Sequence, residues 1–214
     1  MAGSGGNATK VILAALFGNG IISLAKFVAF VFTGSSAMLA EGLHSAADTG
    51  NQVLIYLGLK RSQKPPDATH PYGYGKETYF WSFVVAISIF VLGGSYALYE
   101  GVHKLMHLEA SGGVDNPMWG FGVLGFSLVL ESYVFAVALK EFWKFKGDRT
   151  VRQALQDTRE ASLITVLFED AAAVLGLLTA LIGFGLTVAT QNPVYDAAAT
   201  LLIGVILFVV AVFL

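Results

Sequence analysis

The stretch AEGLHSAAD, residues 40–48, lies in the middle of the apolar segment Ser36–Leu59. The hydrocarbon core of a bilayer takes about 20 predominantly apolar residues as a helix, and this segment is long enough to cross it. Glu41, His44 and Asp48 are three and four residues apart, so a helix places them along one stripe. A charge at mid-bilayer costs roughly 2.5–3.5 kcal/mol, so the stripe is not expected to face lipid. The stretch therefore predicts a membrane-spanning helix whose polar side faces other helices or water.

The rest of the chain has the same apolar character. Of its 214 residues, 55% are hydrophobic and only 13% are charged, and the mean hydropathy is +0.66. Soluble domains average about 25% charged residues. Five further segments are long and apolar enough to span: Val11–Thr33, Thr78–Tyr99, Pro117–Leu139, Ser162–Thr190 and Pro193–Leu214. The sequence predicts an all-α membrane protein with six transmembrane helices.

The domain organisation predicted from these segments is simple. Residues 1–9 are polar and glycine-rich, which predicts a disordered N-terminal tail. Residues 10–214 are expected to form a single six-helix transmembrane domain, with no soluble C-terminal domain. A net charge of −2 and the small number of basic residues exclude a nucleic-acid partner. The absence of cysteine excludes disulfides and thiolate metal sites.

Basic residues fall on one side of the predicted spans. They precede the first span and occupy the second-to-third and fourth-to-fifth connections, whereas the third-to-fourth connection has only Lys104 and the other two have none. Cytoplasmic loops carry the excess of Lys and Arg in membrane proteins. Both termini are therefore expected to face the cytoplasm.

Ionisable residues within the spans indicate a metal site. His44 and Asp48 are one helical turn apart, and the fifth span carries Glu169 and Asp170. Zinc takes about four N, O or S ligands in a tetrahedron, and an imidazole with carboxylates suits zinc or another transition metal. The alternative is a buried hydrogen bond between His44 and Asp48 that only holds helices together.

Several runs together resemble the cation diffusion facilitator family, most closely its zinc-transporter-9 branch. These runs are residues 40–48, ADTGNQ at 47–52, HPYGYGKE at 70–77, FEDAAA at 168–173 and NPVYD at 192–196. The resemblance extends over all six predicted helices and corresponds to the membrane domain of that family. It implies a homodimeric transporter rather than an enzyme, which exports zinc or a related divalent cation from the cytoplasm in exchange for protons.

The resemblance also assigns ligands. His44, Asp48 and Asp170 fall on the transport-site positions of the family. The fourth position is Val166, which cannot bind a metal ion, and Glu169 is a possible substitute although it lies about 100° around the helix from Asp170.

A second family site would lie in the loop before the third span. Its positions correspond to Asp67, His70 and Tyr74. Tyr74 stands where the family has histidine, so this second site is expected to be weak or absent.

Two functional hypotheses follow. The first is an alternating-access antiporter that exchanges a divalent metal ion for protons, with no bound cofactor. Zinc, manganese, cobalt, cadmium and iron(II) all suit the ligand types, so the sequence does not choose among them. The alternative is a non-transporting structural or partner-binding membrane protein. A bacterial protein would sit in the inner membrane and a eukaryotic one in an organelle membrane.

Overall fold

The computed structural model describes the backbone of residues 4–33, 36–107, 117–155 and 161–214. Within these ranges, the side chains of residues 4–10, 26, 29–30, 32–33 and 36–44 lie outside the description. Every regular element in the described residues is helical. The expected all-α class is confirmed.

Each predicted span coincides with a helix. The elements are α1 (Ser4–Thr33), α2 (Ser36–Ser62), α3 (Glu77–Ser88), η1 (Ile89–Ser95), α4 (Tyr96–Met106), α5 (Pro117–Lys146), α6 (Val151–Leu155), α7 (Ala161–Thr190) and α8 (Val194–Phe213). The short π-helix η1 joins α3 to α4 without a break, so these three form one long rod. Prolines stand only at helix starts or in loops, where a missing N–H costs no helical hydrogen bond.

The N-terminal end of α1 differs from expectation. The helix begins at Ser4, inside the segment 1–9 that the sequence predicts to be disordered. The helix over the apolar residues continues towards the N-terminus because each added residue forms one more backbone hydrogen bond onto an existing turn.

Within the described residues, four helical stretches are long and apolar enough to cross a bilayer: Glu77–Met106, Pro117–Lys146, Ala161–Thr190 and Val194–Phe213. A shorter apolar helical stretch covers Val11–Ala25. Several side chains of the first two expected spans lie outside the description, so the total of six membrane spans stays a prediction.

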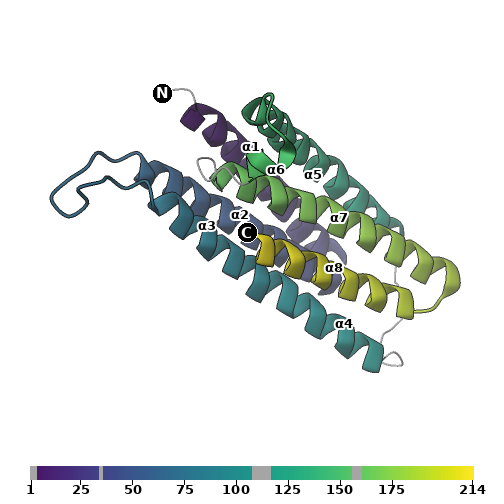
Figure 1. Ribbon diagram of the computed structural model, residues 1–214. Coiled ribbons are helices and arrows are strands. Elements are labelled where there is room, and N and C mark those ends of the chain that lie inside the picture. The colour runs from purple at the N-terminus through teal and green to yellow at the C-terminus, as the bar shows by residue number, and fades with distance from the viewer. Residues whose placement is uncertain (1–3, 34–35, 108–116, 156–160) are drawn as a thin grey trace.

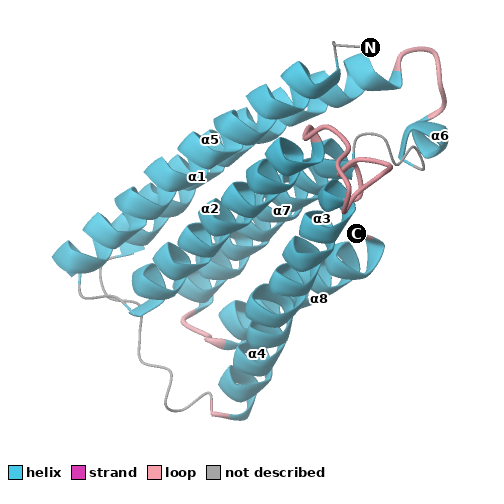
Figure 2. Ribbon diagram, turned by 90° about the vertical axis from the view of Figure 1, so that its left-hand side faces the viewer, coloured by secondary structure: helices cyan, strands magenta, loops and turns pink. Residues whose placement is uncertain are grey.

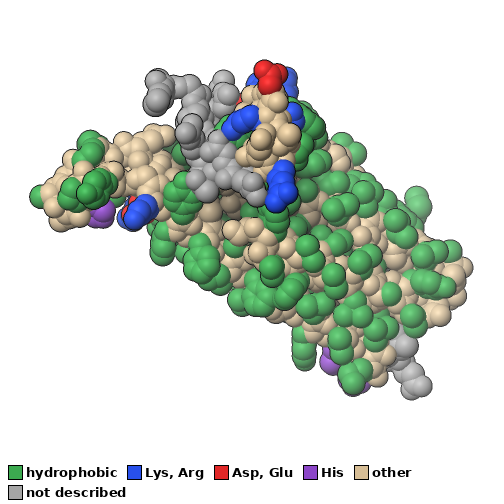
Figure 3. Space-filling model, in the orientation of Figure 1, with side chains coloured by type: hydrophobic (Ala, Val, Ile, Leu, Met, Phe, Trp, Pro, Cys, Tyr) green, Lys and Arg blue, Asp and Glu red, His purple; other side chains and the backbone are tan. Residues whose placement is uncertain are grey.

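The helices form an elongated bundle with α7 packed between α5 and α8 (Figure 1). Helix α1 lies beside α2 and α5, and the α4 end of the long rod packs against α8. Helix α1 begins, and α8 ends, at the end of the bundle that carries α6 and the α2–α3 loop (Figure 2). Lys and Arg side chains gather toward that end, whereas hydrophobic side chains cover most of the visible face (Figure 3). An apolar exterior fits a surface that faces lipid chains.

Small residues allow α4 and α8 to approach closely. A Cβ on Gly101 would lie 2.8 Å from the backbone nitrogen of Leu201, and a Cβ on Gly204 would lie 2.8 Å from that of Leu98. Such contacts between glycine and backbone are common where membrane helices pack tightly. Near the other end of this interface Lys104 Nζ lies 3.0 Å from Asp196 Oδ2, which ties α4 to α8.

Candidate metal site

Helix α2 turns a polar stripe toward the interior of the bundle. Ser45, Asp48, Gln52 and Ile55 are all buried, and their spacing of three and four residues places them on one side of the helix. Position 44 lies one turn before Asp48 on the same helix. The side chain of His44 lies outside the described residues, as does that of Glu41.

Helix α7 supplies the facing acidic residues. Val166, Glu169 and Asp170 are buried, and Asp170 is only 1% exposed. Neither carboxylate oxygen of Asp170 has a hydrogen-bond partner among the described residues. Buried polar groups are nearly always hydrogen-bonded, so this carboxylate is available for a ligand.

Glu169 is bound very differently from its neighbour Asp170. Asn51 Nδ2 donates a hydrogen bond of 2.9 Å to Glu169 Oε1, and Gln52 Nε2 donates to Glu169 Oε2. Two consecutive amides of α2 therefore occupy both oxygens of this carboxylate on α7. The proposed substitution of Glu169 for the ligand missing at Val166 stays a prediction.

Glu131 on α5 is a further buried acid that interacts with Glu169 and Asp170. The metal site predicted from the sequence does not include it. Glu131 is 2% exposed, and its charge acts on both Glu169 and Asp170. The only hint in the sequence is that Ser127 and Glu131, one turn apart, interrupt an otherwise apolar segment. That spacing does not reveal which helix they face.

Acidic residues of three helices are thus buried in the interior. The charges of Asp48 on α2 and Glu131 on α5 both disfavour a charge on Glu169 and Asp170 of α7. Buried carboxylates that repel one another are costly when charged, and a bound cation would offset that repulsion. No three His, Cys, Asp or Glu side chains within the described part of the chain lie close enough together to hold a metal ion, and His44 is outside that part. The predicted ligand set of His44, Asp48, Asp170 and Glu169 is therefore not tested by the geometry.

The loop between α2 and α3 closes on itself through hydrogen bonds. Tyr74 Oη donates to Asp67 Oδ2 at 2.6 Å, and Asp67 Oδ1 accepts from the backbone N–H groups of Thr69 and His70. The rings of His70 and Tyr74 stack with centroids 4.0 Å apart. Gly73 makes the turn with a φ of 78°, which glycine adopts without strain.

These bonds change the acidity of the two partners in the loop. The hydrogen bond from Tyr74, with those from Thr69 and His70, holds the pKa of Asp67 well below its usual range. The same contact with Asp67 raises the pKa of Tyr74. The three positions of the expected second site are thus joined to one another by protein contacts.

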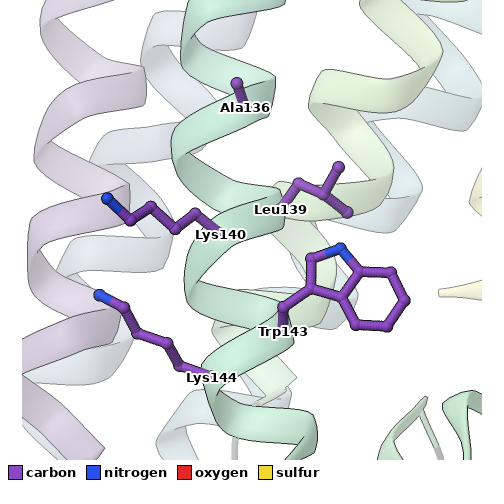
Figure 4. Close-up of a pocket in the computed structure, with 5 residues that line it drawn as sticks. All are labelled: Ala136, Leu139, Lys140, Trp143 and Lys144. Atoms are coloured by element: carbon purple, nitrogen blue, oxygen red, sulfur yellow. The ribbon is translucent and has the colours of Figure 1, made fainter.

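A shallow hollow on α5 has the opposite character to the buried acidic group. It is lined by Ala136, Leu139, Lys140, Trp143 and Lys144 (Figure 4). The two lysines extend along one side of the helix and Trp143 along the other. Cationic and apolar groups do not attract a metal cation, so this hollow is not a metal site.

The sequence of the chain matches a known protein family over most of its length. The family profile described as the cation efflux transmembrane domain matches residues 12–214. This match covers the four apolar helices and the residues 48 and 170 of the candidate site.

Several characterised proteins are similar over the same region. The mitochondrial proton-coupled zinc antiporter SLC30A9 of Xenopus laevis is 38% identical over 207 residues, which are 96% of this chain and 36% of that protein. Metal tolerance protein C4 of Arabidopsis thaliana is 33% identical over 207 residues, 96% of this chain and 45% of that protein. The magnetosome protein MamB of Magnetospirillum gryphiswaldense is 36% identical over 109 residues, 51% of this chain and 35% of that protein. The chain thus spans less than half the length of the curated relatives it matches.

Proposed function

The chain belongs to the cation efflux family, the cation diffusion facilitators, and on that premise we propose that it carries a divalent metal ion across a membrane in exchange for protons. It is a multi-pass integral membrane protein. We propose zinc as the transported ion, because similar proteins from Xenopus laevis and other animals are named zinc antiporters. A transport role, rather than catalysis, accounts for the buried acidic group.

One observation carries the proposal. Asp170 is only 1% exposed, neither of its oxygens has a hydrogen-bond partner among the described residues, and the charges of Asp48 and Glu131 act on it electrostatically. Burying a charge without compensation is costly, and a sequence of neutral residues would avoid that cost. A group retained in this state is expected to have a ligand, and a cation is the ligand that a carboxylate binds.

The transport site is proposed to consist of His44, Asp48 and Asp170. In a zinc site with three protein ligands, a water molecule would take the fourth position. Metal ligands must lose their protons before they bind, so metal ions and protons compete for the same side chains. When the site opens to the other side of the membrane, reprotonation of the ligands releases the metal ion. Alternating access of this kind makes the exchange of metal for protons obligatory.

The alternative is a membrane protein in which buried polar residues only hold helices together. The hydrogen bonds of Glu169 to α2 fit that role, but Asp170 does not, because a structural contact needs a partner. We therefore favour transport. We also propose that the chain forms the homodimer that the family implies. The mass of the purified protein in detergent would give its oligomeric state.

Zinc uptake into proteoliposomes tests the proposal. Vesicles with the unsubstituted chain are expected to take up zinc when a pH gradient is imposed, and those with Asp48→Asn or Asp170→Asn are not. Asp148→Asn is the matched control, because it makes the same change at an exposed residue between α5 and α6. Uptake that is equal in all four proteins would contradict the assignment of the site.

A further inference from the structure

Glu169 connects the two helices that carry the proposed ligands. It is 5% exposed and directly precedes Asp170 on α7, while its two hydrogen-bond donors, Asn51 and Gln52, lie about one turn after Asp48 on α2. These bonds join residues that are 117 and 118 positions apart in the sequence. They join α2, one turn after Asp48, to α7 directly beside Asp170.

We propose that Glu169 is a positioning residue for the metal site, which holds Asp48 of α2 and Asp170 of α7 in register through its hydrogen bonds to Asn51 and Gln52. The inference rests on the proposed transport function, because it concerns the same site. It gives Glu169 a role different from that of a substitute ligand for the position of Val166.

Two features of the geometry support positioning over direct metal binding. Both oxygens of Glu169 already accept amide N–H groups, whereas both oxygens of Asp170 have no hydrogen-bond partner among the described residues. Consecutive residues of an α-helix point about 100° apart, so the two carboxylates diverge from α7. Carboxylates and carbonyl groups that orient metal ligands typically contribute a factor of about 10–100 to metal affinity although they do not touch the metal.

The buried amide of Gln52 makes the two roles distinguishable. Its Oε1 atom has no hydrogen-bond partner among the described residues. In Glu169→Gln, the new amide can accept from Asn51 through its oxygen and donate its N–H to Gln52 Oε1 once the Gln52 amide turns over. The contact between α2 and α7 is then retained without the carboxylate. In Glu169→Ala both bonds are lost, and the two amides of α2 remain buried without an acceptor.

The experiment measures the zinc dissociation constant of the full chain in lipid nanodiscs by competition with a chelating dye. Glu169→Ala is expected to weaken zinc binding by about 10–100-fold, and Glu169→Gln to keep most of the affinity. The control is Glu100→Ala, which removes a carboxylate from α4, a helix that packs against α8 and η1. X-ray absorption of bound zinc is expected to show the same ligands in Glu169→Gln as in the unsubstituted protein.

A second variant keeps the test decisive where Glu169→Ala does not fold. The double variant Asn51→Ala with Gln52→Ala leaves Glu169 in place but removes both donors. Positioning predicts a loss of zinc affinity similar to that of Glu169→Ala, whereas a ligand role predicts affinity close to that of the unsubstituted protein.

The outcomes separate this inference from the proposed function. If Glu169→Gln loses as much affinity as Glu169→Ala, or if zinc loses a carboxylate ligand in Glu169→Gln, the positioning role is wrong and the transport proposal stands. If the unsubstituted protein binds no zinc, the transport proposal fails, and this inference fails with it.

Discussion

Neutralising Asp170 should make the metal-free protein more stable, although most substitutions in a protein interior destabilise it. Asp170 is 1% exposed, neither oxygen has a hydrogen-bond partner among the described residues, and the acids Asp48 and Glu131 act on it. An unsatisfied buried polar group costs about 1–3 kcal/mol. Asp170→Asn keeps the shape of the side chain and removes its electrostatic repulsion with the two other acids. We expect the free energy of unfolding to rise by about 1–3 kcal/mol.

Zinc should offset the stability advantage of Asp170→Asn over the unsubstituted protein. A ligand present at 100 times its dissociation constant stabilises the folded state by about 2.7 kcal/mol. The unsubstituted protein gains this amount, whereas Asp170→Asn has lost a ligand and gains little. In a chain of this length, 1 kcal/mol shifts the melting temperature by about 2–4 °C. The variant should therefore melt about 2–12 °C higher in chelator, and lose most or all of that advantage in zinc.

Thermal unfolding followed by tryptophan fluorescence provides the assay, with Trp81, Trp119 and Trp143 as intrinsic probes. Each protein is melted once with a chelator and once with zinc in excess. The control Asp148→Asn changes an exposed carboxylate and should match the unsubstituted protein under both conditions. The reasoning is refuted if metal-free Asp170→Asn melts below the unsubstituted protein, or if zinc stabilises both equally.

Three further predictions concern the bundle and its loop. Gly204→Ala should destabilise the protein by about 1–3 kcal/mol, because the added Cβ meets the backbone of α4. Gly125→Ala, with open space around it, should be neutral or stabilising by up to about 1 kcal/mol. Thermal unfolding compares the two variants, and equal effects would contradict the packing of α4 on α8. The hydrogen bond from Tyr74 to Asp67 should stabilise the loop fully between the ordinary aspartate pKa of 3.8 and the ordinary tyrosine pKa of 10.0. Because the pKa of Asp67 is lowered, its contribution to loop stability is lost as the pH falls below this range. Because the pKa of Tyr74 is raised, its contribution to loop stability is lost as the pH rises above this range. The protection of the loop amides from hydrogen exchange, taken relative to the intrinsic exchange rate at each pH, should therefore fall at both extremes. Tyr74→Phe should exchange faster than the unsubstituted loop at neutral pH, and equal rates would contradict the bond. Lys104→Ala should lower the free energy of unfolding by no more than about 1 kcal/mol, because both members of its ion pair with Asp196 are partly exposed. A larger loss of stability in a melting experiment would contradict this weak role for the ion pair.

The positions of the helices were predictable from the sequence, because hydropathy and helix length depend on residues close together in the chain. Each of the six segments coincides with a helix, and the runs that include Asp48 and Asp170 point to the same family as the profile match over residues 12–214. The start of α1 at Ser4 was not predictable, because the polar residues there have no strong preference of their own and follow the helix that they extend.

The surroundings of the site were less predictable. Glu131 joins the acidic group, and Glu169 is bound by amides 117 and 118 residues away. Both features depend on how far each helix is rotated about its axis, and that rotation is set by packing against helices distant in the sequence. Sequence spacing shows which residues share a helix face, but it does not show which neighbour that face meets.

The coupling of zinc movement to proton movement tests the central claim most directly. Zinc is added outside proteoliposomes with equal pH on both sides, and zinc and pH inside are recorded in the same vesicles with two fluorescent indicators. The account predicts that entering zinc drives protons out, so that the interior becomes alkaline in proportion to the zinc taken up, and that Asp170→Asn abolishes both signals. Zinc entry without any change of internal pH, or proton movement that persists in Asp170→Asn, would contradict it.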